Sequence, residues 1–273
     1  MIDFFTIASG SSGNCTYVGL GGHHFLVDAG ISGKRIEHAL QEMKLNAGDL
    51  SGIFITHEHS DHITGAGVLA RRFNIPIYAT PLTWRYFLRH NAIGSTKAFS
   101  KDMIKHIEPG TSINVDNISV TAFDVSHDAS QPVGYTFEIK PEGASSIKKF
   151  AIATDLGHVT ETVRFHLRGS NILMLESNHD PEMLEKGRYH ASLKARVASK
   201  RGHLSNAEAG MLLTEIADEN LEHVFLAHLS EENNNPMIAY DTVKRILDGN
   251  NINIKKLSIA ERHQPGEFIR YGS

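Results

Sequence analysis

The chain of 273 residues contains a single cysteine, Cys15. One thiol excludes a disulfide within the chain, and so low a cysteine content is typical of a reducing compartment. Long apolar runs are missing as well. No segment approaches the roughly 20 apolar residues of a membrane-spanning helix, and the sequence does not open with a basic stretch followed by an apolar one. We therefore expect a cytoplasmic protein that has no membrane partner.

An excess of positive charge is also lacking. The chain carries 27 Lys and Arg against 31 Asp and Glu, which gives a formal net charge of −4. This balance provides no global attraction to nucleic acid, although it is compatible with a local basic groove beside a functional site. The hydrophobic share of 41% and the charged share of 21% are ordinary for a globular protein, so the composition does not predict disorder.

Short apolar segments that end in small or polar residues recur in both halves of the chain, and helical patterns follow them. Strands grouped early in each half, with helices after them, predict two sheets packed together and covered outside by helices. The predicted fold is therefore a four-layer αββα sandwich of the α/β class. The predicted strands are residues 4–8, 15–18, 25–27, 53–56, 75–79, 118–125, 133–139, 150–154, 172–175, 224–229 and 257–260, and the predicted helices are residues 34–45, 63–73, 82–91, 161–168, 193–200, 206–218 and 236–248.

The two halves are not separated by a linker rich in glycine, serine or proline. Residues 141–146, with the sequence PEGASS, lie between two predicted strands. Their composition is typical of a hairpin turn rather than of a domain boundary. We therefore expect one domain that spans residues 1–273.

Histidine is abundant, with 17 residues. The densest cluster directly follows the predicted strand at residues 53–56 and also contains an aspartate: His57, His59, Asp61 and His62. Alternate side chains of an extended backbone share a face, so His57 and His59 can bind the same metal ion. Where the chain then bends into a helix, Asp61 and His62 turn toward a neighbouring position. Imidazole and carboxylate ligands suit Zn²⁺, Mn²⁺ or Fe²⁺. The cluster therefore predicts a site for two divalent metal ions.

The pattern HxHxDH at a strand end resembles the signature of the metallo-β-lactamase superfamily. The zinc-protease motif HExxH is excluded, because it needs a histidine where Asp61 stands. The resemblance implies further metal ligands at later strand ends, namely His127, Asp155 and His228, with Asp155 bridging both ions. It also implies that Asp28 does not bind metal itself but contacts and orients one of the metal ligands. Alone, each residue could cap a helix or a turn; together, they complete a dinuclear site.

Three branches of this superfamily match the sequence poorly. Flavodiiron oxidoreductases have a glutamate where His59 stands, which disfavours redox chemistry. Cysteine-type zinc β-lactamases place a thiolate on the second metal, but Cys15 is far from the later ligands in the sequence. The β-CASP nucleases insert a whole domain, and the stretch from Asp155 to His228 is short for one.

Further segments resemble the small bacterial YycJ/WalJ proteins, also called VicX. These are residues 9–14 (SGSSGN), 56–62 (THEHSDH), 126–129 (SHDA), 176–180 (ESNHD), 202–206 (GHLSN) and 228–234 (HLSEENN). This resemblance extends over nearly the whole chain. It implies metal-dependent 5′-to-3′ exonuclease activity on DNA, with RNA as a further candidate substrate, and a gene that accompanies an essential two-component regulatory system.

Phosphodiester cleavage needs an activated water, neutralisation of charge on the phosphate, and an acid for the leaving oxygen. We expect a hydroxide between the two ions, aligned by Asp61 or Asp155, to attack phosphorus. His203 resembles a histidine that in tRNA-processing relatives pairs with a glutamate and protonates the leaving group, and Glu176 occupies the position of that glutamate. The alternative for His203 is a structural role at a helix start that is capped by Ser205.

Substrate contacts are expected from two loops. Small residues in the 9–14 loop let its backbone approach a phosphate closely, with Ser11 and Asn14 as contacts, although the loop is equally typical of a hairpin turn. Asn178 and His179 are candidates that could instead cap the loop after their strand.

Two other functions stay open. The same metals polarise a carbonyl, so an ester or thioester hydrolase is the first alternative. The second is a regulatory protein, linked to a two-component system, whose metal site is structural. Metal identity, DNA or RNA preference, polarity and oligomeric state are not determined by the sequence.

Overall fold

Most strands are apolar at consecutive positions, so both of their faces must be covered. The computed structural model describes residues 1–92, 99–141, 143 and 146–272. In β11 (Ile172–Glu176), Ile172 and Met174 join a core between two sheets, whereas Leu173 and Leu175 join a core beneath helices. Successive side chains of a strand point to opposite faces, which explains why an unbroken apolar run is needed here.

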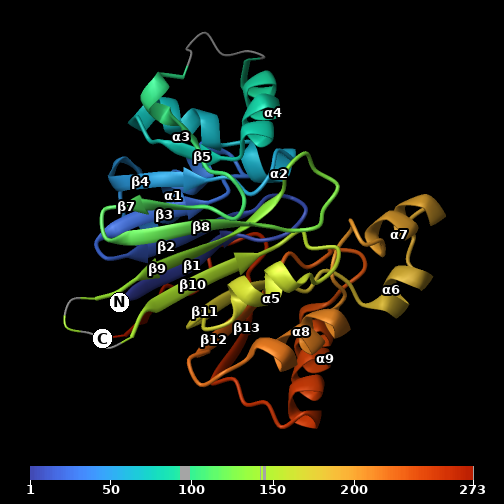
Figure 1. Cartoon of the computed structure of the whole chain (residues 1–273). Helices are drawn as coiled ribbons and strands as arrows, with labels where there is room; N and C mark the ends of the chain where they lie inside the picture. The colour runs from blue at the N-terminus through green and yellow to red at the C-terminus, as the bar shows by residue number, and fades with distance from the viewer. Residues whose placement is uncertain (93–98, 142, 144–145, 273) are drawn as a thin grey trace.

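The strands form two seven-stranded sheets of matching design (Figure 1). The orders are β14-β1-β2-β3-β4-β5-β6 and β13-β12-β11-β10-β9-β8-β7. In each sheet the earlier strands pair antiparallel and the later ones parallel, and only β14 leaves its own half to pair with β1. The strands are β1 Ile2–Ala8, β2 Cys15–Leu20, β3 His23–Val27, β4 Leu50–Phe54, β5 Ile77–Ala79, β6 Ile104–His106, β7 Ser112–Val115, β8 Ile118–Asp124, β9 Val133–Ile139, β10 Lys148–Ala153, β11 Ile172–Glu176, β12 His223–Ala227, β13 Lys256–Ile259 and β14 Ile269–Tyr271.

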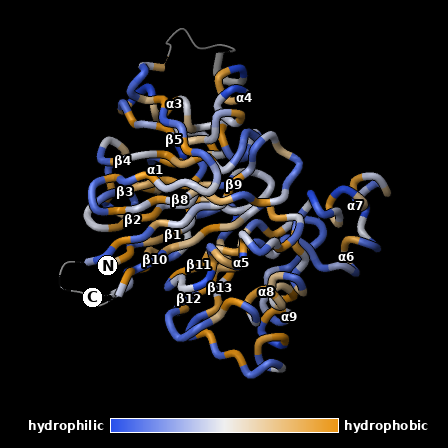
Figure 2. The backbone as a smooth tube through the Cα atoms, viewed as in Figure 1, coloured by the Kyte–Doolittle hydropathy of each residue, from blue (hydrophilic) through white to orange (hydrophobic). Residues whose placement is uncertain are grey.

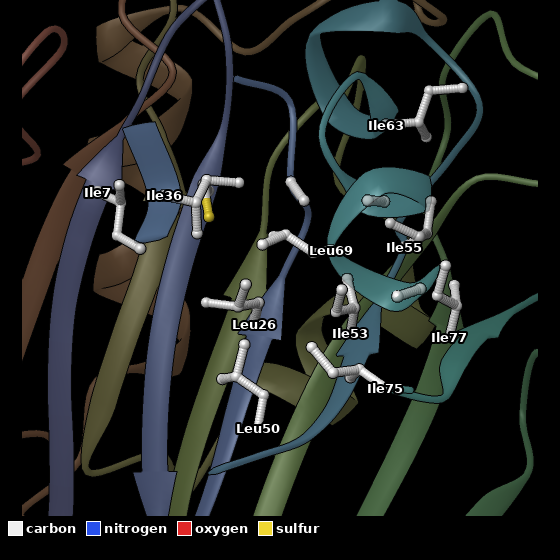
Figure 3. Close-up of a cluster of buried hydrophobic side chains, with 14 of the residues drawn as sticks. Ile7, Leu26, Ile36, Leu50, Ile53, Ile55, Ile63, Leu69, Ile75 and Ile77 are labelled. Carbon is white, nitrogen blue, oxygen red and sulfur yellow. The ribbon is translucent and has the colours of Figure 1, made fainter. Parts of the chain in front are cut away.

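Helices cover the outer face of each sheet. One apolar core joins the first sheet to α1, α3 and α4 (Figure 3), and another joins the second sheet to α5, α8 and α9. Figure 2 shows hydrophobic residues recurring along the strands and helices of this sandwich. The predicted αββα architecture is confirmed. The helices are α1 Gly33–Glu42, η1 Ala47–Asp49, α2 Ser60–Ile63, α3 Ala66–Phe73, α4 Pro81–Ala92, η2 Lys101–Met103, α5 Glu161–Leu167, α6 Pro181–Lys186, α7 Ala191–Val197, α8 Asn206–Ile216 and α9 Pro236–Gly249.

The predicted helix at residues 63–73 is wrong in one respect, because the chain forms two helices there, α2 and α3. Gly65 lies between them and its N–H donates to the carbonyl of Ala29 at 2.7 Å. A Cβ at Gly65 would lie 2.2 Å from the carbonyl oxygen of Ile31, so close packing requires glycine. The break turns the chain directly after the His57 cluster and brings that segment against residues 29–31.

Six of the described elements were not predicted: the strands β6, β7 and β14, the helix α6, and the short helices η1 and η2. The three strands lie at sheet edges and are short, and their side chains are largely half-buried or exposed. Such strands lack the apolar run by which buried strands are recognised. The predicted hairpin around residues 141–146 is consistent with the antiparallel pairing of β9 and β10, although residues 142, 144 and 145 lie outside the described chain.

Membrane insertion through a helix finds no support in the part of the chain that the structure describes. Every helix there is too short or too polar to cross a lipid bilayer.

His223 links the two sheets near the C-terminus. This buried residue of β12 hydrogen-bonds Ser258 of β13 at 2.8 Å, and its other ring nitrogen contacts the hydroxyl of Tyr271 in β14. Burial, together with the charge of Lys256, lowers the pKa of His223 to about 3. Because histidine in an unfolded chain titrates near 6.5, the unfolded state takes up the proton first as the pH falls. Neutral His223 therefore makes its full contribution to the free energy of unfolding above about pH 6.5, and this contribution is lost progressively as the pH falls to about 3.

We therefore expect a His223→Gln variant to lose less of its melting temperature than the wild type when the pH falls from 7 to 4. At pH 7 the variant should be less stable by about 1–2 kcal/mol, because the hydrogen bonds are impaired. Thermal melts at several pH values test this. His38→Gln is the control, since the His38 side chain is 73% exposed on α1. Equal pH slopes for the His223 variant and the wild type would contradict the assignment.

Candidate metal centre

The polar residues singled out by the sequence gather at the carboxyl ends of strands from both sheets. Asp28 directly follows β3, and His228 directly follows β12. Asp28, Asp155 and His228 have positive φ angles of 59°, 56° and 55°. Residues other than glycine rarely adopt this left-handed conformation, and it persists where surrounding contacts hold it, often at functional sites. The backbone conformation at these three strand ends is therefore unusual and is of the kind found at functional sites.

All seven predicted metal ligands lie in one cluster. His57, His59 and His127 offer ring nitrogens that lie within 4.8 Å of one another. A second group, Asp61, His62 and His228, meets the same limit.

Asp155 lies between these two groups. One of its carboxylate oxygens, Oδ2, is 3.2 Å from Nε2 of His62, and the other, Oδ1, is 3.6 Å from Nε2 of His127. Asp155 Oδ1 is also 3.6 Å from Nδ1 of His228. A carboxylate in this position contacts both ligand groups, as a bridging ligand must.

Four of the histidine rings are oriented by an oxygen atom behind the cluster. When Nδ1–H donates to such an oxygen, the lone pair of Nε2 is left free, which is the arrangement of a metal-binding imidazole. His59 is the exception, because its Nδ1 lies 2.9 Å from Nε2 of His57. The four pairs are His57 with Thr56 Oγ1 at 3.0 Å, His62 with Asp28 Oδ2 at 2.8 Å, His127 with the carbonyl of Gly202 at 3.1 Å, and His228 with Glu176 Oε1 at 2.8 Å.

The donor set fits divalent cations. Nε2 of His228 is buried and has no hydrogen-bond partner among the described residues, and Oδ2 of Asp155 has none there beyond its 3.2 Å contact with Nε2 of His62. Burial and the neighbouring imidazoles hold the pKa of His57 well below its ordinary value, so this ring is a neutral ligand. Burial opposes ionisation of Asp155, but His228 and His62 outweigh it and hold its pKa well below the ordinary value. A metal ion satisfies buried lone pairs of this kind, and we conclude that the cluster binds divalent metal.

Asp28 is hydrogen-bonded to the segment that carries the His57 cluster. Its carboxylate accepts hydrogen bonds from the backbone N–H of Thr56 at 2.8 Å and from Nδ1 of His62. Two residues later, Gly30 packs so closely that a Cβ would lie 1.5 Å from the carbonyl oxygen of Asp61. Asp28 and Gly30 therefore fix both the side chain and the backbone of the ligand segment.

Glu176 and His203 form the predicted pair, with Nδ1 of His203 at 2.9 Å from Oε1 of Glu176. Glu176 is fully buried, and burial alone would raise its pKa, but His203 and His228 lower that pKa to about 2. The side chain of His203 is 20% exposed. Ser205 caps α8 in a capping box with Glu208, so the capping role belongs to Ser205 and leaves the His203 ring free to pair with Glu176. Glu176 therefore contacts both His203 and the predicted metal ligand His228.

Two of the four predicted substrate contacts, Ser11 and Asn178, line a cavity of about 220 Å³ beside His127 and His203. This volume is below the usual range for a drug-sized ligand and suits a smaller group.

Asn14 and His179 are not among the described residues that line this cavity. Asn14 is buried, and its side-chain nitrogen lies 3.1 Å from Nε2 of His62 and 3.4 Å from Oδ2 of Asp61. It therefore lies against two of the predicted metal ligands, and its contact with substrate stays a prediction. His179 is also buried, and its contact with substrate stays a prediction.

Several residues around the cavity were missed by the sequence. Asp128 lines the cavity but was not proposed as a site residue, whereas its neighbour His127 was. Arg196 of α7, which forms an ion pair with Asp128, also lines the cavity. Gly202, whose carbonyl orients His127, was noted only as part of a family segment. These contacts join residues about 70 positions apart, so local patterns carry no signal for them.

The chain is similar to known proteins along most of its length. The family described as "Beta-lactamase superfamily domain" matches residues 23–229. Exodeoxyribonuclease YycJ of Bacillus anthracis is 39% identical over 247 residues, which cover 90% of this chain and 89% of that protein. Exodeoxyribonuclease WalJ of Streptococcus pneumoniae is 37% identical over 237 residues, 87% of this chain and 85% of that protein.

Solved structures share the fold. The short form of human tRNase Z has a TM-score of 0.65 at 19% identity, covering 99% of this chain and 100% of that chain. A diphosphatase of the PhnP family has a TM-score of 0.65 at 16% identity, with 98% of each chain covered. Because the sequence relatives align along most of both chains and the fold agrees, this chain belongs to the metallo-β-lactamase superfamily and, within it, to the YycJ/WalJ family.

Proposed function

We propose that the protein is a metal-dependent phosphodiester hydrolase that degrades DNA as a 5′-to-3′ exonuclease. The observation that carries the proposal is the convergence of four oriented imidazoles on the buried carboxylate of Asp155, next to the exposed edge of His203. The relatives named exodeoxyribonucleases support the choice of DNA. We also propose that the whole chain acts as one domain, because apolar residues of both sheets share one core.

The proposed cofactor is a pair of divalent ions, Zn²⁺ or Mn²⁺, with Fe²⁺ as a third candidate. Such ions would activate a water molecule and neutralise charge that develops on the phosphate. Asp155 would be shared between the two sites. The first ion would be held by His57, His59 and His127, and the second by Asp61, His62 and His228.

The remaining groups position the substrate and move protons. Asp61 is partly exposed, and its carboxylate would orient the attacking water. His203 faces the cavity and is held by Glu176, so it would give its proton to the leaving oxygen of the sugar. The cavity between His203 and Ser11 would receive a phosphate or sugar group next to the scissile bond.

The test uses purified protein, elemental analysis and linear duplex DNA labelled at either the 5′ or the 3′ end. We expect about two divalent ions per chain and metal-dependent release of mononucleotides from the 5′ end. Removing metal with a chelator should abolish cleavage, and adding Mn²⁺ or Zn²⁺ should restore it. Bis-p-nitrophenyl phosphate should be hydrolysed under the same conditions.

Parallel assays with single-stranded DNA, RNA, esters and thioesters distinguish the alternatives. Turnover of esters by metal-loaded protein that leaves every nucleic acid and bis-p-nitrophenyl phosphate intact would overturn the proposal. Release from the 3′ end would refute the polarity while leaving the phosphodiesterase in place.

A further inference from the structure

One segment of the chain has a charge opposite to that of the rest. Residues 186–203, called the basic arm below, contain no Asp or Glu, although acidic residues outnumber basic ones in the whole chain. The arm carries a formal charge of +6, and the remainder of the chain carries −10. The six cations are Lys186, Arg188, Lys194, Arg196, Lys200 and Arg201.

The basic arm borders the metal centre. It begins at the last residue of α6 and contains α7, and both helices project beyond the sandwich at the end to which β10 points (Figure 1). Leu193 and Arg196 of the arm line the same cavity as His127. At the base of the arm, the carbonyl of Lys200 accepts a hydrogen bond from Ser126 Oγ at 2.8 Å, and that of Gly202 lies 3.1 Å from Nδ1 of His127. The arm is thus anchored directly to the loop that carries a metal ligand.

The arm does little to build the core. No residue of α7 is buried, whereas α8 and α9 bury apolar residues against the second sheet. Figure 2 shows hydrophilic residues along much of the segment around α6 and α7. The side chains of α7 are therefore accessible to a partner rather than used in the core.

Several cations of the arm are available to a partner. Arg196 is paired with Asp128, and Lys186 with Glu182. Arg188 and Lys200 are exposed, and neither forms an ion pair with any residue that the structure describes. Unpaired cations on a segment that also lines the cavity beside His127 complement a polyanion, because each phosphate that Lys or Arg neutralises releases condensed counterions.

We propose that the basic arm binds the phosphate backbone of the DNA substrate and holds the strand end at the metal centre. The inference rests on the proposed function and explains how a chain of net negative charge engages a polyanion. The arm contributes affinity without base contacts, so its effect is independent of sequence and sensitive to salt.

The test is the double variant Arg188→Glu/Lys200→Glu, prepared as the metal-loaded protein. At about 0.1 M salt we expect the KM for linear duplex DNA to rise about tenfold or more. The slope of log kcat/KM against log salt concentration should become shallower by about two, which corresponds to two lost phosphate contacts. Hydrolysis of bis-p-nitrophenyl phosphate and metal content should stay at wild-type values, because Arg188 and Lys200 are not among the described residues that line the cavity beside His127.

The matched control is Lys140→Glu/Arg245→Glu, which makes the same charge change at exposed positions after β9 and on α9. It should alter the KM for DNA by less than about twofold. A wild-type KM and salt slope in the arm variant would overturn the proposal, and so would an equal loss in the control. If the wild-type protein itself cleaves neither DNA nor the small ester, the proposed function fails instead.

Discussion

Replacing Asp155 by asparagine is expected to lower phosphodiester hydrolysis by on the order of a thousandfold. The carboxylate of Asp155 lies 3.2 Å from Nε2 of His62 and 3.6 Å from Nε2 of His127, so it contacts both ligand groups. An amide has the same shape but no negative charge, and only one of its two ends can bind a cation. The loss therefore affects both metal positions together.

This substitution separates chemistry from folding. Asp155 has a φ of 56°, and asparagine is among the few residues that tolerate this left-handed conformation. The backbone should therefore stay in place, whereas alanine at this position would add strain. Metal content, turnover of bis-p-nitrophenyl phosphate and thermal melting are the measurements.

Asp124→Asn is the control, since Asp124 is an exposed carboxylate at the end of β8. It should retain full activity. If the Asp155 variant keeps wild-type metal content and at least a tenth of the activity, Asp155 is not a bridging ligand.

The second large effect is expected for Glu176→Gln. The five hydrogen-bond partners of Glu176 are all donors: three backbone N–H groups and the Nδ1 atoms of His203 and His228. A glutamine has one oxygen and one NH₂ group, so in either orientation a donor faces donors. We expect a loss of about 3 kcal/mol in unfolding free energy and a decrease of 10- to 100-fold in turnover of DNA.

The leaving group distinguishes a role in proton transfer from a purely structural one. p-Nitrophenolate leaves without help from an acid, whereas the sugar oxygen of DNA needs a proton. Both Glu176→Gln and His203→Ala should therefore retain a larger share of activity on bis-p-nitrophenyl phosphate than on DNA. Equal losses on the two substrates would contradict the role of His203 as the acid.

Glu161→Gln is the control for Glu176, because the Glu161 side chain is 88% exposed and pairs only across one helical turn with Arg164. Its stability should change by less than about 0.5 kcal/mol.

The sequence predicted the architecture where apolar patterns are dense. Central strands such as β11 are apolar at every position but the last, Glu176, because both faces are buried, and they were found within a few residues of their observed bounds. Edge strands such as β14 were missed, since half-exposed residues have no such pattern. The break between α2 and α3 was missed because a carbonyl from residue 31 determines it, not the helix itself.

For the site, the sequence by itself determined the kind of chemistry. The HxHxDH segment places three imidazoles and a carboxylate within six consecutive residues, and both the type of ligand and its local spacing can be read from the sequence. Only the tertiary structure decided how these groups work together. The carbonyl that orients His127 comes from a residue 75 positions away, and Glu176 meets His228 across 52 positions. The basic arm lies beside the cavity for the same reason, since strand order brings distant loops to one edge and a local pattern does not encode that order.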